Sequence, residues 1–115
     1  MSRPRAAIVV TGSELVRGER TDLNGPFFAR EALGLGLEPT RITVVGDRAE
    51  ELEDALRAAV ADAALCLVSG GLGPTHDDRT VALVASVSRR ELVLDAELER
   101  RIEEISRGFA ERLRR

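Results

Sequence analysis

The chain passes from an apolar run into a polar, glycine-rich stretch, Ser69-Gly70-Gly71-Leu72-Gly73-Pro74-Thr75-His76-Asp77-Asp78-Arg79-Thr80. The apolar run before it, residues 63–68, is typical of a buried strand, and the small and apolar residues from Val81 onward predict a helix. Glycine permits positive φ and close approach to a ligand, and the unpaired N–H groups at a helix start attract anions. The stretch therefore predicts a phosphate-binding turn, with Asp77 or Asp78 placed to hold a cation or a ligand hydroxyl.

A simpler interpretation of the same stretch needs no ligand. Thr75 and Asp78 have the spacing of a capping box, in which two side chains satisfy the unpaired N–H groups of a helix start. On this alternative the glycines form only a tight connection between two elements.

Segments typical of strands and of helices alternate along the rest of the chain. We expect strands at residues 6–11, 41–45 and 63–68, and a short extended piece at 92–94. We expect helices from Asn24 or Pro26 to about 33, at 50–61, at 80–87 and from 96 onward. This alternation predicts an α/β domain with a parallel sheet, and 115 residues allow no more than one domain.

Polar residues follow each of the three main predicted strands. Ser13 and Glu14 follow the first strand, Asp47 follows the second, and the stretch 69–78 follows the third. In open α/β sheets, ligands bind outside the carboxyl ends of the strands. The sequence therefore predicts a binding site at this edge of the sheet.

Composition excludes several functions. All 17 basic residues are Arg, so a Schiff-base lysine and the lysine of a P-loop are both absent. Cys66 is the only cysteine and His76 the only histidine, which argues against a disulfide or a structural zinc site, and His76 is expected to be a solvated loop residue. The net charge of −3 and the lack of Trp and Tyr argue against nucleic-acid binding. No apolar run is long enough to span a membrane, so we expect a cytoplasmic protein.

The last predicted helix carries one apolar stripe, formed by Leu98, Ile102, Ile105, Phe109 and Leu113. Its other faces are rich in Glu and Arg, so the stripe is the only face of this helix suited to burial. Two arrangements stay open. The helix packs on the sheet of its own chain, or it pairs with a second copy and forms a homo-oligomer.

Three segments of the chain resemble the competence/damage-inducible protein CinA family: Thr11-Gly12-Ser13-Glu14-Leu15 with Gly18 and Thr21-Asp22-Leu23-Asn24, then Val44-Val45-Gly46-Asp47, and the stretch 69–80. The resemblance covers residues 6 to about 105. It implies a molybdopterin-binding-domain-like fold of the MoaB/Mog type, a three-layer α/β sandwich with a mostly parallel sheet. Relatives continue through further strands, so residues 1–115 are expected to form a single, partial domain that is incomplete at its C-terminus and has no deamidase domain.

The resemblance also implies a function, namely hydrolysis of the pyrophosphate of ADP-ribose with a divalent metal such as Mg²⁺. It implies Asp47 and Asp78 as catalytic carboxylates and metal ligands. The residues implied to contact the ligand are Gly12, Ser13, Glu14, Asn24, Ser69, Gly70, Gly71, Leu72, Gly73, Pro74 and Thr75.

Two other functions stay open. One is binding of molybdopterin or adenylyl-molybdopterin in molybdenum cofactor biosynthesis, and the other is a non-catalytic nucleotide-binding or assembly module. Leu72 and the tandem Asp77-Asp78 favour the CinA type. On each alternative the partner is a small nucleotide or pterin ligand, and the sequence leaves open whether the chain is an enzyme.

Overall fold

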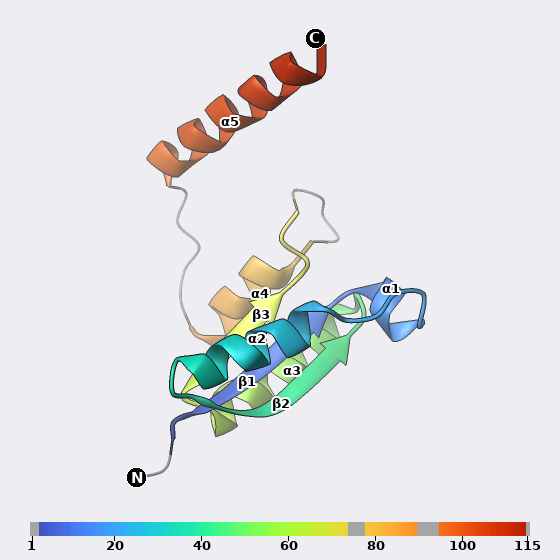
Figure 1. Cartoon of the computed structure of the whole chain (residues 1–115), viewed down its shortest axis with the longest axis vertical. Helices are drawn as coiled ribbons and strands as arrows, with labels where there is room; N and C mark the ends of the chain where they lie inside the picture. The colour runs from blue at the N-terminus through green and yellow to red at the C-terminus, as the bar shows by residue number, and fades with distance from the viewer. Residues whose placement is uncertain (1–2, 74–77, 90–94, 115) are drawn as a thin grey trace.

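The structure, a computed structural model, describes residues 3–73, 78–89 and 95–114 (Figure 1). Three parallel strands form its sheet in the order β2-β1-β3: β1 (Arg5–Thr11), β2 (Glu38–Val45) and β3 (Leu65–Ser69). In this register Ile8 of β1 lies opposite Ile42 of β2 and Leu67 of β3. The three carboxyl ends therefore lie at one edge of the sheet.

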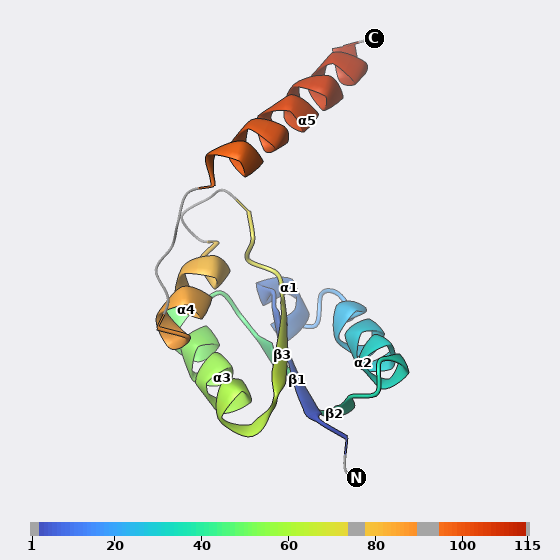
Figure 2. The same cartoon turned by 90° about the vertical axis from the view of Figure 1, so that its left-hand side faces the viewer.

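Helices cover both faces of this sheet. Figure 2 shows α2 (Asn24–Gly34) on one face, with α3 (Ala49–Asp62) and α4 (Thr80–Val87) on the other. A single turn, α1 (Ser13–Val16), follows β1, and α5 (Ala96–Arg114) ends the chain. The predicted three-layer α/β fold with a parallel sheet is confirmed.

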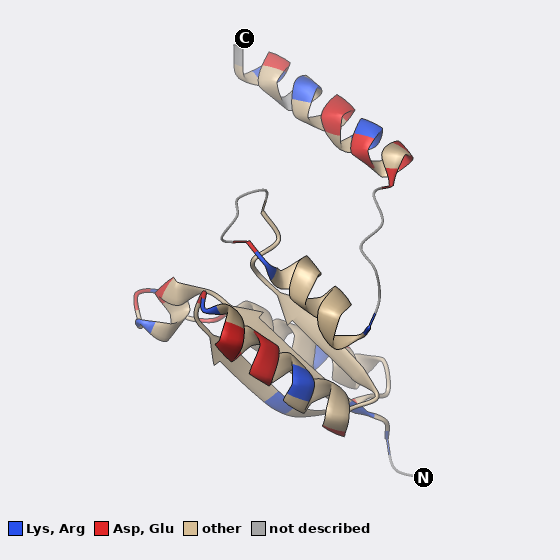
Figure 3. Ribbon diagram, turned by 180° about the vertical axis from the view of Figure 1, so that it is seen from behind, with Lys and Arg blue, Asp and Glu red and all other residues tan. Residues whose placement is uncertain are grey.

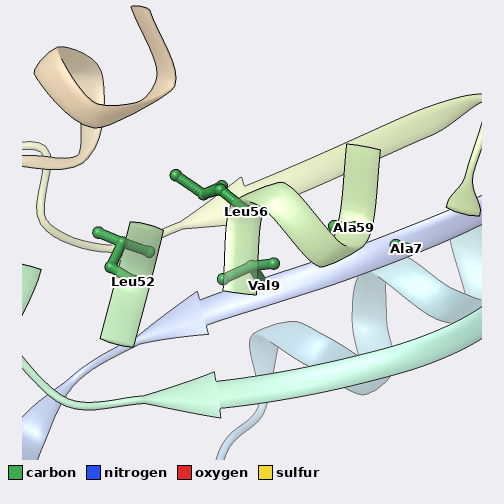
Figure 4. Packing of buried hydrophobic residues seen from close by; sticks show 5 residues of the cluster. All are labelled: Ala7, Val9, Leu52, Leu56 and Ala59. Carbon is green, nitrogen blue, oxygen red and sulfur yellow. The ribbon is translucent and has the colours of Figure 1, made fainter. Parts of the chain in front are cut away.

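The core forms around the central strand, because β1 is buried on both of its faces from Ala6 to Val10. Ala7 and Val9 pack against α3, whose buried residues recur at helical spacing: Leu52, Leu56 and Ala59 (Figure 4). The alternation of a strand turns Ile8 to the opposite face of the sheet, which α2 covers. This packing fixes the position at which β1 ends.

Most predicted bounds agree with the structure to within one or two residues, and β2 departs from its prediction most. It begins at Glu38, three residues before the predicted start, and it includes Pro39. Because β2 lies at an edge of the sheet, proline is tolerated there. The register shifts between Ala6 and Ala7, since these residues pair with Pro39 and Arg41 and pass over Thr40. The predicted extended piece at 92–94 lies outside the described residues.

Helix α5 stands apart from the sheet in Figures 1 and 2 and makes no extensive contact with another described element. Acidic and basic residues alternate along it in Figure 3. The described apolar side chains of its stripe, Leu98, Ile102, Ile105 and Leu113, are each more than half exposed, and the side chain of Phe109 lies outside the described part. In this structure the stripe does not pack on the sheet of its own chain.

Of the helices in the described ranges, none is long and apolar enough to cross a bilayer.

Candidate functional site

Two hydrogen bonds join the end of β1 to the end of β2. The Gly12 N–H donates to the Val45 carbonyl oxygen at 2.9 Å, and the Thr11 hydroxyl donates to the Gly46 carbonyl oxygen at 3.1 Å. These bonds hold the turn after β2 beside the end of β1, and Asp47 follows directly in that turn.

The turn after β3 requires glycine at two consecutive positions. Gly70 has φ of 96° and Gly71 has φ of 63°, a left-handed backbone that other residues adopt only with strain. A Cβ atom on Gly70 would collide with the carbonyl oxygen of Thr11, and one on Gly71 would collide with the hydroxyl of Thr80. The positive φ predicted for this turn is therefore present. Atoms of Thr11 and Thr80 also lie close to the two glycines.

Helix α4 holds the glycine turn through its first residue. The Thr80 hydroxyl donates to the Gly70 carbonyl oxygen at 2.7 Å, and the Thr80 N–H donates to the Gly71 carbonyl oxygen at 3.3 Å. α4 begins at Thr80, and its N-cap, Arg79, makes no side-chain capping bond. The alternative capping box of Thr75 and Asp78 stays a prediction, because Thr75 lies outside the described residues.

The three strand ends enclose a hollow of about 310 Å³, which we call the strand-end hollow. Among the described residues, three carboxylates line it, from Glu14, Asp47 and Asp78, together with one guanidinium, from Arg79. The described residues of its lining are Thr11, Gly12, Glu14, Asp47, Leu52, Gly70, Gly71, Asp78, Arg79 and Thr80.

Two of the three carboxylates lie against glycine backbone. An oxygen of Glu14 lies 2.9 Å from the position that a Cβ on Gly12 would take, and an oxygen of Asp78 lies 2.6 Å from the corresponding position on Gly73. The absence of side chains at these glycines thus allows both carboxylates to lie over the turns.

A second hollow of about 330 Å³ lies beside the first, and we call it the α2 hollow. The Asn24 amide, at the start of α2, donates to the Ser69 hydroxyl at 3.1 Å across its wall. The two hollows share Thr11, Glu14 and Gly70. The residues of the α2 hollow within the described part of the chain are Val10, Thr11, Glu14, Leu15, Arg20, Thr21, Asp22, Leu23, Asn24, Ser69 and Gly70.

The predicted site residues divide between the two hollows. Those in the strand-end hollow are Gly12, Glu14, Asp47, Gly70, Gly71 and Asp78, and the α2 hollow adds Asn24 and Ser69. Three predicted residues, Ser13, Leu72 and Gly73, line neither hollow. The other predicted residues, Pro74, Thr75 and Asp77, lie outside the described residues, and so does His76, which was expected to be a solvated loop residue.

Sequence reasoning missed Thr11 and Thr80, which line the strand-end hollow and hold its turns. Their signal is positional, since Thr11 is the last residue of β1 and Thr80 is the first residue of the helix after the glycine turn. The prediction relied on charged residues and glycines. A threonine whose hydroxyl donates to a backbone carbonyl cannot be told from other threonines in the sequence, so both residues were missed.

No three His, Cys, Asp or Glu side chains in the described ranges lie close enough together to hold a metal ion by themselves. Asp47 and Asp78 nevertheless line one hollow, and their carboxylates have oxygen atoms, the donors that Mg²⁺ accepts. Mg²⁺ commonly takes only one or two carboxylates and completes its coordination with phosphate oxygens. The residues present therefore fit such a cation only together with a phosphate-bearing ligand.

Cys66 lies away from both hollows. It lines an apolar cavity of about 170 Å³ between α3, β3 and α4, which has no residue in common with either hollow. Burial raises the pKa of the Cys66 thiol, because it disfavours the thiolate. The thiol is correspondingly less reactive than an exposed one.

Comparison with known proteins identifies relatives over most of the chain. The family model described as a probable molybdopterin binding domain matches residues 7–112. A CinA-like protein of Mycobacterium sp. (strain MCS) is 52% identical over 104 residues, which are 90% of this chain and 25% of that protein. The chain thus spans about a quarter of the length of the curated relatives that it matches.

Solved structures show the same fold. The protein CinA of Thermoplasma acidophilum, described as of unknown function, superposes with a TM-score of 0.76 at 32% identity, over 83% of this chain and 56% of that one. MoaB of Pyrococcus furiosus, described as a tungsten cofactor synthesizing protein, superposes with a TM-score of 0.68 at 26% identity, over 75% of this chain and 54% of that one.

The glycine turn gives a prediction about stability. We expect Gly71→Ala to lower the free energy of unfolding by about 1–2 kcal/mol through its left-handed backbone alone, with a further loss from the contact with Thr80. Gly46→Ala is the control, because a Cβ there meets no atom within 4 Å and the residue lacks positive φ. Urea unfolding followed by circular dichroism measures both. Equal stabilities of the two variants would contradict the geometry of the turn.

Proposed function

The chain belongs to the family of probable molybdopterin binding domains, and from this premise we propose that its strand-end hollow binds the phosphate or diphosphate group of a small molecule of nucleotide or pterin type. The observation that carries this proposal is the glycine turn at Gly70 and Gly71, which has positive φ and lies at the wall of a hollow lined by Asp47 and Asp78. Backbone N–H groups in such turns are suited to phosphate oxygens.

Charge in the strand-end hollow supports a divalent cation as part of this binding. Among the described residues of its lining, three carry a carboxylate and one carries a guanidinium, so these side chains would repel an anionic diphosphate that binds alone. A bound cation such as Mg²⁺ would supply positive charge to the phosphate oxygens. Asp47 and Asp78 are the residues that we propose hold it, since both line the same hollow.

For an active enzyme we propose hydrolysis of a pyrophosphate bond, with ADP-ribose as the substrate to test first. Such a reaction needs negative charge to be neutralised on the phosphate oxygens and a water molecule to be positioned. The carboxylates of the hollow can accept a hydrogen bond from that water, and the Arg79 guanidinium, which lines the same hollow, suits a phosphate oxygen. Positioning the water and stabilising the phosphate oxygens in this way require no lysine, which the chain lacks, and no histidine, of which it has one.

The α2 hollow supports a ligand with two parts. It shares the wall formed by Thr11, Glu14 and Gly70 with the strand-end hollow, so one ligand can extend from its phosphate into both. A pterin with a phosphate fits this description as a nucleotide does, and molybdopterin is therefore the second candidate. A module that binds either compound without turnover is the third candidate.

We expect Asp47→Asn and Asp78→Asn each to weaken Mg²⁺-dependent binding of ADP-ribose by at least about tenfold, because the amide keeps the shape of the side chain and loses its charge. Asp54→Asn removes the same charge from an exposed position on α3 and is the control. Isothermal titration with and without Mg²⁺ gives the affinities, and release of AMP measures turnover. ADP-ribose, AMP and molybdopterin are compared on the unchanged protein first, and binding of none of them would overturn the proposed function.

We also propose that the apolar stripe of α5 pairs with a second copy of the chain. Helices in proteins owe most of their stability to the packing of an amphipathic face, and the four described side chains of the apolar stripe are more than half exposed. We expect the mass from light scattering to rise with concentration, and Ile105→Asp to return it to that of one chain. Arg100→Ala changes the net charge equally on another face of α5 and is the control. A wild-type mass equal to that of one chain at every concentration would exclude pairing.

A further inference from the structure

Thr80 is the one polar or charged residue that is buried within the described part of the chain, with 2% of its surface exposed. It is the last residue of the glycine-rich stretch, and in the folded chain it contacts Gly70 and Gly71 near the start of that stretch. A buried hydroxyl needs a hydrogen-bond partner, and the partner here is the carbonyl oxygen of Gly70 at 2.7 Å.

Thr80 binds two consecutive carbonyls of the turn. Its hydroxyl donates to Gly70, and its N–H donates to the Gly71 carbonyl oxygen at 3.3 Å. In a planar trans peptide the C=O and the next N–H point in opposite directions. When Thr80 holds these two carbonyls, the N–H groups of Gly71 and Leu72 must therefore point away from Thr80. Within the ranges that the structure describes, neither N–H donates to a backbone carbonyl.

The peptide between Gly70 and Gly71 is the one that most needs such a restraint. Glycine occupies positive and negative φ with similar ease, so a peptide between two glycines can turn over at little cost. After that rotation, the Gly70 carbonyl would take the direction that the Gly71 N–H has now. An oxygen with partial negative charge would then replace a hydrogen-bond donor.

Neighbouring atoms confine the same peptide on both sides. The Thr80 hydroxyl lies where a Cβ on Gly71 would be, and the Thr11 carbonyl oxygen lies where a Cβ on Gly70 would be. Thr11 restricts the turn by contact, whereas Thr80 also forms a directed hydrogen bond. The bond from Thr80 is thus the interaction that distinguishes the two orientations of the peptide.

We propose that Thr80 is a positioning residue for phosphate binding, and that its hydroxyl holds the Gly70–Gly71 peptide in the orientation that offers the Gly71 N–H to a phosphate oxygen of the ligand. This inference rests on the proposed function. Thr80 itself does not contact the ligand in this proposal, because it acts through the backbone of the turn.

The test compares Thr80→Ser with Thr80→Ala. Both variants lose the methyl group of threonine and differ by one hydroxyl, so any difference between them reports the hydrogen bond to Gly70. With ADP-ribose and Mg²⁺ as the probe, we expect Thr80→Ser to keep an affinity within about threefold of wild type. We expect Thr80→Ala to lose about 10- to 100-fold, the range for one hydrogen bond to a charged group.

A second measurement needs no ligand. Amide NMR spectra of the free protein should show the Gly71 resonance of Thr80→Ser close to that of wild type, and that of Thr80→Ala shifted or split. Equal affinities and equal Gly71 resonances in the two variants would overturn the inference. If the wild type binds no ADP-ribose, the proposed function fails, and the Gly71 resonance alone then decides whether Thr80 holds the peptide.

Discussion

The carbonyl oxygen of Thr11, at the end of β1, lies where a side chain on Gly70 would begin. This close approach joins the end of the central strand to the turn after β3, and only glycine allows it. The Thr11 hydroxyl meanwhile donates to the Gly46 carbonyl in the turn after β2. One residue thus contacts the turns on both sides of the central strand, and the strand-end hollow lies among them. The packing of α3 and α2 on β1 fixes where Thr11 lies, so the site depends on the core beneath it.

The charge of its lining would not by itself make the strand-end hollow a binding site for an anion. Another hollow, of about 570 Å³, lies at the opposite ends of the strands, and Arg3 and Arg5 line it together with Asp62. Simple attraction between charges would favour that position. In the proposed function, N–H groups of the glycine turn bind the phosphate and carboxylates of the strand-end hollow hold a cation, so the phosphate and the cation must bind there together. This requirement separates the proposed site from a merely basic surface.

The sequence predicted the parts of the fold that follow from hydrophobic periodicity and from glycine. The apolar run of β1 and the spacing of Leu52, Leu56 and Ala59 were sufficient for the strand and the helix that form the core. The early start of β2 was missed because Pro39 is unfavourable in most strands and is tolerated at this edge. The positive φ of Gly70 and Gly71 followed from residue type. The role of Thr80 did not, because its partners are backbone carbonyls ten and nine residues away, which only the folded chain brings near.

An amide NMR titration of the whole chain with ADP-ribose in the presence of Mg²⁺ tests whether a phosphate and a cation bind together at the strand ends. Joint binding predicts that the largest shifts occur at Gly12, Asp47 and Gly71, and that they diminish when Mg²⁺ is removed. Shifts concentrated at residues 3–5 and 61–64, at the other end of the sheet, or shifts that are the same without Mg²⁺, would contradict it.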